Sequence, residues 1–154
     1  METPMFKQSI GLLLLMSGFI ASARAEQGCP YPSQIAYSDG HYRAQDNGLR
    51  WQSPKVASRG VIDGFIGAVF MPGEGEERGN GYMDKCIYRT SWNGVVALRP
   101  SRGNEVINMS LTSTVYWKLQ PDAFELPVYT CVDSQPDNCA FKVNDKRTDL
   151  SVVR

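Results

Sequence analysis

The chain has 154 residues, of which 42% are hydrophobic and 21% are charged, with 16 basic and 16 acidic side chains. The charge balance excludes a general nucleic-acid-binding protein and a polybasic membrane anchor. The apolar content exceeds that of a disordered chain, so we expect a folded domain.

The first 25 residues are typical of an export signal. Lys7 precedes an apolar run over residues 10–20, and Ala23-Arg24-Ala25 offers a small-x-small cleavage pattern. The run is too short for the ~20 residues of a membrane-spanning helix. No cysteine follows it directly, so no stable membrane anchor is expected. The sequence therefore predicts cleavage after Ala25 and a single periplasmic or secreted domain over residues 26–154.

Four cysteines, Cys29, Cys86, Cys131 and Cys139, lie in the predicted mature chain. An even number of cysteines in a small exported domain predicts two disulfides, for which three connectivities exist. A turn over residues 132–138 favours Cys131–Cys139, which leaves Cys29–Cys86. A zinc site is disfavoured because the chain has no Cys-x-x-Cys pair and one histidine.

Residues 34–53 predict a three-stranded antiparallel meander. Asp39-Gly40 and Asn47-Gly48 are typical of type I′ hairpin turns. With two-residue turns, Tyr37 faces Tyr42 and Ala44 faces Trp51, and Leu49 joins their apolar face. The opposite face is polar. It collects Gln34, His41, Arg43, Gln45, Arg50 and Gln52.

A third hairpin is predicted at Asn93-Gly94. A two-residue turn would pair Trp92 with Val95 and Thr90 with Ala97. In that register Val96 and Leu98 lie opposite the face of Cys86 and Tyr88, and both faces are buried. Further strands are expected at 61–71, 124–132 and 140–143, while 106–117 is compatible with a strand or a helical turn. The expected fold is all-β, a small antiparallel β-sandwich or partly open β-barrel stapled by disulfides.

The residues carry no catalytic motif, and we predict no catalytic residue, no metal and no cofactor. His41 is expected on the polar face as a solvated side chain. Asp63 interrupts an apolar strand and is the best candidate for a carboxylate-dependent hydrolase. An edge position that directs Asp63 to water is favoured instead.

The segment from Pro72 to Gly81 contains four glycines and three glutamates. Such a loop is longer than a hairpin requires, and long loops in small domains are often functional. We therefore expect a partner contact at Glu74, Glu76, Glu77 and Arg78; a plain solvated loop is the alternative. Tyr37, Tyr42 and Trp51 could form a sugar platform, but core packing is favoured for them.

The pattern Cys29-Pro30-x-Pro32, Tyr37-x-Asp39-Gly40-x-Tyr42, Trp51, Cys86-x-Tyr88, Cys131 and Cys139-x-Phe141 resembles a family of small exported bacterial proteins known as a domain of unknown function. The resemblance implies the fold and a periplasmic address, and it transfers no catalytic residue.

Three functions follow as hypotheses. The first is a non-enzymatic exported β-domain that binds a protein of the cell envelope, either inhibitor- or immunity-like or accessory to a secretion system. The second is a carboxylate-dependent hydrolase of the envelope. The third is a carbohydrate-binding module.

Overall fold

Ten antiparallel strands build the part of the chain that the computed structural model describes, residues 26–73 and 79–144. No α-helix occurs in these two ranges, which contain the short 3₁₀ turns η1 (Pro32–Gln34) and η3 (Pro136–Asn138). The strands are β1 (Ala36–Ser38), β2 (His41–Asp46), β3 (Leu49–Gln52), β4 (Ile62–Pro72), β5 (Asn80–Thr90), β6 (Val95–Ser101), β7 (Asn108–Ser110), β8 (Lys118–Pro121), β9 (Pro127–Val132) and β10 (Lys142–Asn144). The all-β prediction is confirmed.

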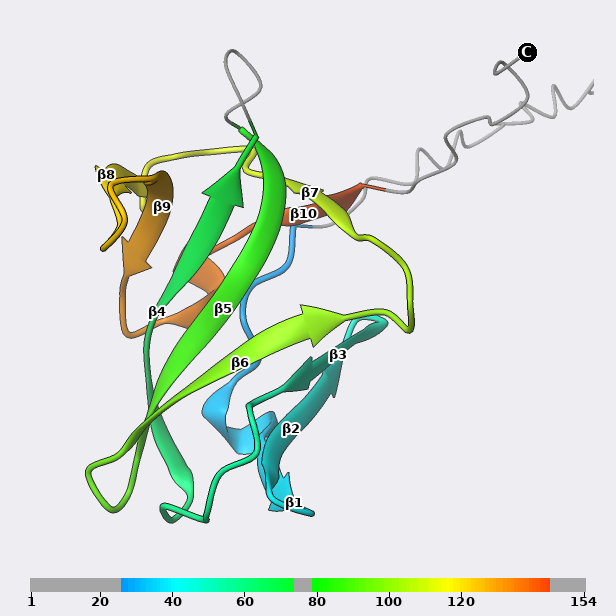
Figure 1. The fold of residues 1–154 in the computed structure, drawn as a ribbon, viewed down its shortest axis with the longest axis vertical. Coiled ribbons are helices and arrows are strands. Elements are labelled where there is room, and N and C mark those ends of the chain that lie inside the picture. The colour runs from blue at the N-terminus through cyan, green and yellow to red at the C-terminus, as the bar shows by residue number, and fades with distance from the viewer. Residues whose placement is uncertain (1–25, 74–78, 145–154) are drawn as a thin grey trace, which may run out of the picture.

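The strands form one open sheet in the order β1-β2-β3-β6-β5-β4-β9-β8, and the sheet does not close into a barrel. β7 pairs with both β5 and β10 beside this path. The β1–β3 meander lies at one end of the molecule, and the β8–β9 hairpin lies at the other (Figure 1). The long strands β4 and β5 connect the two ends.

The predicted meander is confirmed in register. Tyr37 pairs with Tyr42 and Ala44 pairs with Trp51. Asp39, Gly40, Asn47 and Gly48 all have positive φ, as both central residues of a type I′ turn must.

The predicted register of the third hairpin is wrong. Arg89 pairs with Val95 and Tyr88 with Val96, so the connection is longer than two residues. Asn93 has a positive φ of 58°, but Gly94 does not follow it into that region. The observed register places Val96 and Leu98 on the buried face with Cys86 and Tyr88. Val95 on the other face is 56% exposed, so the hairpin is not buried on both sides.

The other strand predictions differ in extent. The strand expected at 61–71 is β4 (Ile62–Pro72), and the strand expected at 140–143 is β10 (Lys142–Asn144). Residues 124–126 belong to the loop before β9. Of the ambiguous segment 106–117, only β7 is a strand, and it contains no helix. β8 was not predicted, because Lys118–Pro121 is exposed throughout and carries no alternating apolar pattern.

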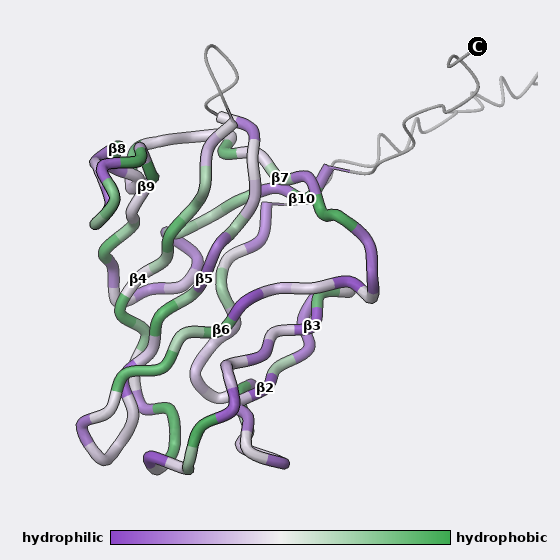
Figure 2. Tube along the Cα trace, viewed as in Figure 1, coloured by the Kyte–Doolittle hydropathy of each residue, from purple (hydrophilic) through white to green (hydrophobic). Residues whose placement is uncertain are grey.

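Aromatic side chains dominate the core. The largest fully buried side chains include Tyr42, Trp51, Phe70, Tyr88 and Phe141. Trp51 meets Phe141 edge-on with ring centroids 6.1 Å apart, a favourable aromatic geometry. In Figure 2 the hydrophobic colour follows β4, whereas β2 is largely hydrophilic. The core therefore lies on the inner face of the sheet, and the polar side of the meander faces outward.

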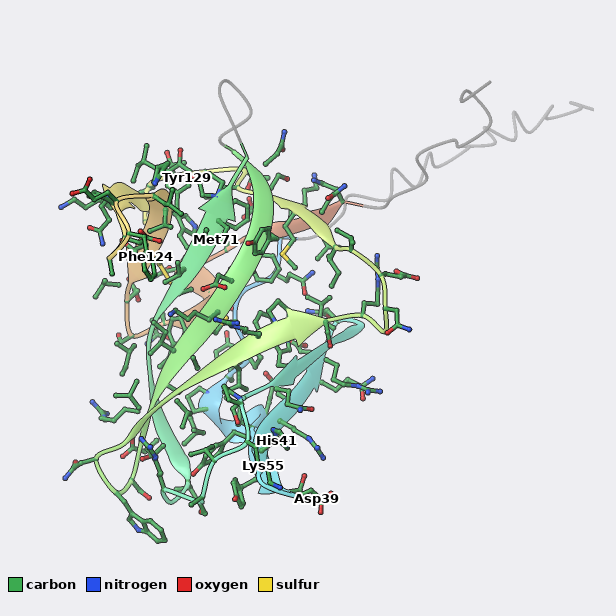
Figure 3. The ribbon with its side chains drawn as sticks, viewed as in Figure 1. Asp39, His41, Lys55, Met71, Phe124 and Tyr129 are labelled. Atoms are coloured by element: carbon green, nitrogen blue, oxygen red, sulfur yellow. A yellow bond between two sulfur atoms is a disulfide. The ribbon has the colours of Figure 1, made fainter. Side chains whose placement is uncertain are left out.

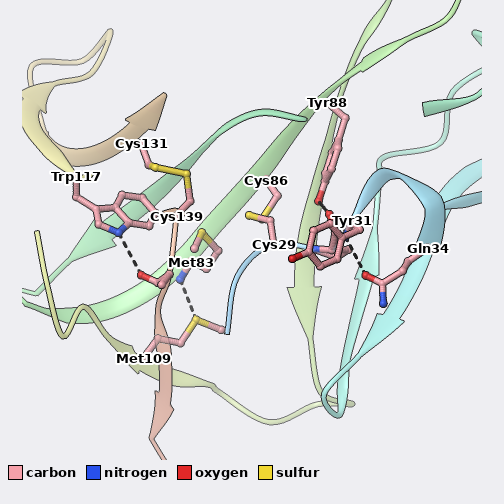
Figure 4. The surroundings of a disulfide bond; sticks show 12 residues. Cys29, Tyr31, Gln34, Met83, Cys86, Tyr88, Met109, Trp117, Cys131 and Cys139 are labelled. Atoms are coloured by element: carbon pink, nitrogen blue, oxygen red, sulfur yellow. Dashed lines mark hydrogen bonds between the residues drawn. A yellow bond between two sulfur atoms is a disulfide. The ribbon is translucent and has the colours of Figure 1, made fainter. Parts of the chain in front are cut away.

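Both disulfides have the favoured connectivity, Cys29–Cys86 and Cys131–Cys139, with Cα–Cα separations of 6.0 and 5.7 Å. The first joins the N-terminal segment to β5, and the second joins β9 to the residue after η3 (Figure 4). No cysteine is free. Two disulfides in a small domain indicate an oxidising, extracellular-type environment. Within the described ranges, no helix has the length and hydropathy to span a membrane.

Candidate partner-binding groove

The predicted contact residues Glu74, Glu76, Glu77 and Arg78 lie outside the described residues. The flanking strands are described up to Gly73, whose amide donates to the carbonyl of Asn80. The acidic segment therefore connects two paired strands at the end of the β4–β5 hairpin. Its role as a partner contact stays a prediction.

His41 and Asp63, the two residues considered for catalysis, both form hydrogen bonds within the protein. The imidazole of His41 is half-buried on the outer face of β2, and its Nδ1 donates to the carbonyl of Ser53 over 2.8 Å. The expected outer face is correct, although the ring is less solvated than predicted. Asp63 is exposed and accepts a hydrogen bond from Arg89 Nε at 3.2 Å. An exposed ion pair of this kind is a surface feature.

The proposed sugar platform is mostly core. Tyr42 and Trp51 are each 1% exposed, whereas Tyr37 is 38% exposed. The rings of Tyr37 and Tyr42 pack with centroids 5.0 Å apart. The prediction of core packing is thus confirmed for Tyr42 and Trp51. The third side chain, Tyr37, lines a separate surface.

That surface is a groove of about 460 Å³ between the meander and the loop that joins β5 to β6. We call it the Trp92 groove. Its lining includes Ile35, Tyr37, Tyr42, Gly60, Val61 and Trp92. Trp92 and Val61 are each 69% exposed, so large apolar side chains stand in water along one wall. Exposed apolar side chains that gather around a groove mark an interaction surface more than scattered ones do.

The backbone beneath Trp92 is fixed by bonds to a distant segment. The amide of Trp92 donates to the carbonyl of Arg59 at 3.2 Å, and the amide of Ser91 donates to the carbonyl of Val61 at 2.8 Å. In return, the Val61 amide donates to Ser91 Oγ at 3.1 Å. The exposed indole therefore stands on an ordered backbone, and little backbone entropy remains to be lost on binding.

The other walls are held in the same way. The Tyr42 hydroxyl donates to the carbonyl of Gly60 and accepts from the amide of Arg59, both at 2.7 Å. Tyr37 donates its hydroxyl to the carbonyl of Val56 at 2.7 Å. Both tyrosine hydroxyls are thus engaged within the protein, and the groove offers mainly apolar surface.

Gly60 is needed for the close approach of Trp92. Its φ is +93°, a conformation that L side chains rarely adopt. A Cβ atom there would collide with Ser91 Oγ and lie 3.2 Å from two indole carbons of Trp92. A glycine at this position lets the indole lie directly against the 58–62 segment.

Two exposed cations lie in the chain segment that leads to this groove. Arg59 stands between the lining residues Ser58 and Gly60, and the Lys55 side chain lies against Gly40 in the first hairpin turn. Among the described residues, no carboxylate lies within 4 Å of either one. Figure 3 shows Lys55 beside Asp39 and His41 at the meander end of the molecule. Arg59 therefore gives the apolar groove a neighbouring positive charge, which suits a partner with an acidic side chain beside an apolar one.

Sequence reasoning missed Trp92 as a site residue, because the predicted turn paired it with Val95 inside the hairpin. The sequence contained one local indication of an exposed aromatic side chain, namely a tryptophan directly before the turn residues Asn93-Gly94. Its exposure depends on bonds to Arg59 and Val61, about 30 residues away, which no local pattern contains.

A second, smaller pocket of about 260 Å³ contains two carboxylates, Glu26 and Asp137. Both residues are exposed, and Asp137 accepts a hydrogen bond from the Tyr31 hydroxyl. That hydrogen bond raises the pKa of the Tyr31 phenol above its ordinary value. Within the described ranges, no group of three or more His, Cys, Asp or Glu side chains could hold a metal ion.

The comparisons with known proteins identify a family and no activity. No curated protein and no solved structure matches the chain. A family model described as "Protein of unknown function" (DUF3757) matches residues 24–142. The match covers nearly all of the described residues, and the chain belongs to this family of proteins of unknown function.

Proposed function

We propose that this protein is an exported, non-enzymatic β-domain that binds a protein of the cell envelope through the Trp92 groove. The partner contributes an apolar side chain that enters the groove and an acidic side chain that meets Arg59. An inhibitor- or immunity-like role, or an accessory role in secretion, fits such a module. The observation that carries the proposal is the 69% exposed indole of Trp92 on a hydrogen-bonded loop. Tryptophan and tyrosine are the residue types that most often dominate binding energy at protein interfaces.

The lining favours a protein over a sugar. A sugar needs hydrogen-bond partners for its hydroxyls, but the hydroxyls of Tyr37 and Tyr42 are engaged within the protein. The apolar wall of Val61, Ile62 and Ile35 offers no replacement. Such a wall suits the apolar core of a protein interface.

The hydrolase alternative has less support. Paired catalytic carboxylates require different surroundings, so that one stays protonated while the other is ionised. Asp63 accepts a hydrogen bond from Arg89 at the exposed surface, and Glu26 and Asp137 are both exposed. None of these carboxylates is buried, as the general acid of such a pair would be.

Site-specific photo-cross-linking tests the proposal. A photoreactive phenylalanine analogue replaces Trp92 in one variant and Phe124 in a matched control. Phe124 is 84% exposed and lies near the other end of the molecule, on the loop before β9 (Figure 3). We expect the position 92 variant to form one discrete protein adduct in cells that make the protein, and the position 124 variant to form none.

Two outcomes contradict the proposal: no protein adduct from position 92, or the same adducts from both positions. A thermal melt close to that of the unmodified protein shows that each variant is folded. Identification of the adduct by mass spectrometry then supplies the purified partner for affinity measurements.

A further inference from the structure

The outer face of the meander is a second surface, separate from the Trp92 groove. Strand alternation places Arg43 and Gln45 on the side of β2 opposite the buried Tyr42 and Ala44. β3 and β6 continue this side. We call it the arginine–glutamine face. It consists of Arg43, Gln45, Arg50, Gln52, Arg99 and Ser101.

The registers arrange this face as two rows across three strands. Arg43 pairs with Gln52, which pairs with Arg99. In the next row, Gln45 pairs with Arg50, which pairs with Ser101. Strand spacing and rise put the Cα atoms of the three arginines about 8–10 Å apart. The Cα atoms of the three arginines thus form a triangle, in which Gln52 lies between Arg43 and Arg99.

Part of this face is hollowed. Gln34, Arg43, Ala44, Gln45, Arg50 and Gln52 line a groove of about 430 Å³. The side-chain Oε1 of Gln34 accepts from the backbone amide of Tyr31 at 2.8 Å, which leaves the side-chain NH₂ group of Gln34 available. Apart from Ala44, every lining side chain is polar, so an apolar ligand gains little here.

The arginines keep free hydrogen-bonding capacity. Arg43 Nε donates to Gln52 Oε1 at 3.2 Å, and one of its terminal nitrogens lies 3.7 Å from Asp39. Arg99 lies 3.7 Å from Asp84. The Arg43–Asp39 and Arg99–Asp84 pairs are long, with both guanidinium groups at the surface, so a ligand carboxylate can compete with Asp39 and with the half-buried Asp84. Among the described residues, no carboxylate lies within 4 Å of Arg50.

This chemistry fits a ligand with spaced carboxylates and hydroxyls. A guanidinium group binds a carboxylate through two parallel hydrogen bonds. A glutamine carboxamide both donates and accepts, as a sugar hydroxyl does. An acidic peptide fits less well, because it lacks the hydroxyls that the glutamine carboxamides would bind. β3 is flanked by β2 and β6, so it cannot accept an added strand.

We infer that the arginine–glutamine face binds an acidic polysaccharide, a sugar chain whose units carry carboxylates. Arg43, Arg50 and Arg99 bind the carboxylates, and Gln34, Gln45 and Gln52 bind the hydroxyls. The inference uses a surface other than the Trp92 groove, and it stands whether or not a protein binds there.

Calorimetric titration of the purified protein with a polygalacturonate oligosaccharide tests this inference. We expect saturable binding that weakens with added salt and is lost with the fully methyl-esterified, neutral oligosaccharide. Arg43→Gln combined with Arg50→Gln should weaken binding at least tenfold. Arg89→Gln removes an exposed arginine on the distant part of β5, and this control should bind as the unaltered protein does, as should Trp92→Ala.

Absence of binding to polygalacturonate overturns the inference. Equal binding of poly-glutamate also overturns it, since the surface would then recognise acidic chains of any kind. The same loss in Arg89→Gln as in the double variant would indicate non-specific attraction and would contradict the site. Circular dichroism and thermal melting of each variant separate a loss of binding from a loss of folding.

Discussion

At the scale of single residues, Gly60 decides where the Trp92 indole stands. Gly60→Ala puts a side chain at φ +93° and drives its Cβ into Ser91 Oγ. We expect a loss of about 1–3 kcal/mol in the free energy of unfolding, measured by urea denaturation, together with a changed tryptophan fluorescence spectrum. Gly48→Ala is the matched control, because Gly48 has φ +78° and open space around it. Equal losses in the two variants would show that backbone strain alone acts at Gly60.

Tyr88 predicts a pH dependence at the same scale. Its side chain is fully buried, and its hydroxyl donates to the carbonyl of Pro30 at 2.6 Å. Burial raises the pKa of Tyr88 far above its ordinary value of 10.0. In the unfolded chain the phenol ionises near that ordinary value, whereas in the folded protein it stays neutral. Its contribution to stability is therefore complete below about pH 10 and falls as the pH rises further.

Tyr88→Phe tests this. The variant should lose about 1–3 kcal/mol at pH 7, because the Pro30 carbonyl is left without its partner. Above pH 10 its stability should fall less steeply than that of the unaltered protein. Urea denaturation at pH 7 and pH 10.5 measures both effects. A parallel fall in both proteins would contradict the assignment to Tyr88.

At the scale of elements, the disulfides differ in the length of chain that they close. Cys29–Cys86 spans 57 residues in sequence and Cys131–Cys139 spans 8. Unfolded-state entropy predicts that loss of the first costs about 4 kcal/mol and loss of the second about 2.5 kcal/mol. Paired Cys→Ser variants with urea denaturation measure the two values. The reverse order of stabilities would contradict the entropic account for this domain.

The hairpins show how far local sequence determines an element. The pairs Asp39-Gly40 and Asn47-Gly48 were sufficient to predict their turns. Both residues of each pair have positive φ, and apolar and polar residues alternate in the flanking strands. Asn93-Gly94 carries the same local signal, yet the loop bonds to Arg59 and Val61 and takes another register. Non-local hydrogen bonds thus override a turn preference of this strength. The same bonds expose Trp92, so the candidate groove could not be predicted from the sequence.

At the scale of the whole molecule, the predicted acidic contact and the Trp92 groove belong to opposite ends of β5. β5 begins at Asn80, next to the 74–78 segment, and ends at Thr90, next to the Trp92 loop. Glu74→Gln, Glu76→Gln and Glu77→Gln together should leave the melting temperature unchanged. If this segment steers a basic partner, the triple variant should associate more slowly and with a flatter salt dependence, as stopped-flow kinetics would measure. Unchanged association rates across salt would show that the segment has no part in binding.

The positions of the cysteines and the alternation of apolar residues were sufficient to predict the disulfide pairing and the fold class. Both disulfide pairs and the all-β class are as expected. β8 was missed because its four residues are exposed and carry no apolar alternation. The Trp92 groove depends on hydrogen bonds between distant segments, which composition and spacing do not encode. The polar residues of the second groove, in contrast, were expected together on the outer face of the meander.

The central claim is that the Trp92 groove binds a protein, and the affinity of the cross-linked partner for Trp92→Ala tests it most directly. Because Trp92 is 69% exposed, its replacement should leave the free energy of unfolding within about 0.5 kcal/mol of the unaltered value. The account predicts that Kd rises by about 30-fold or more, the loss of roughly 2 kcal/mol that defines a hot spot. A Kd that changes by less than about threefold, in a variant that melts normally, would contradict the account.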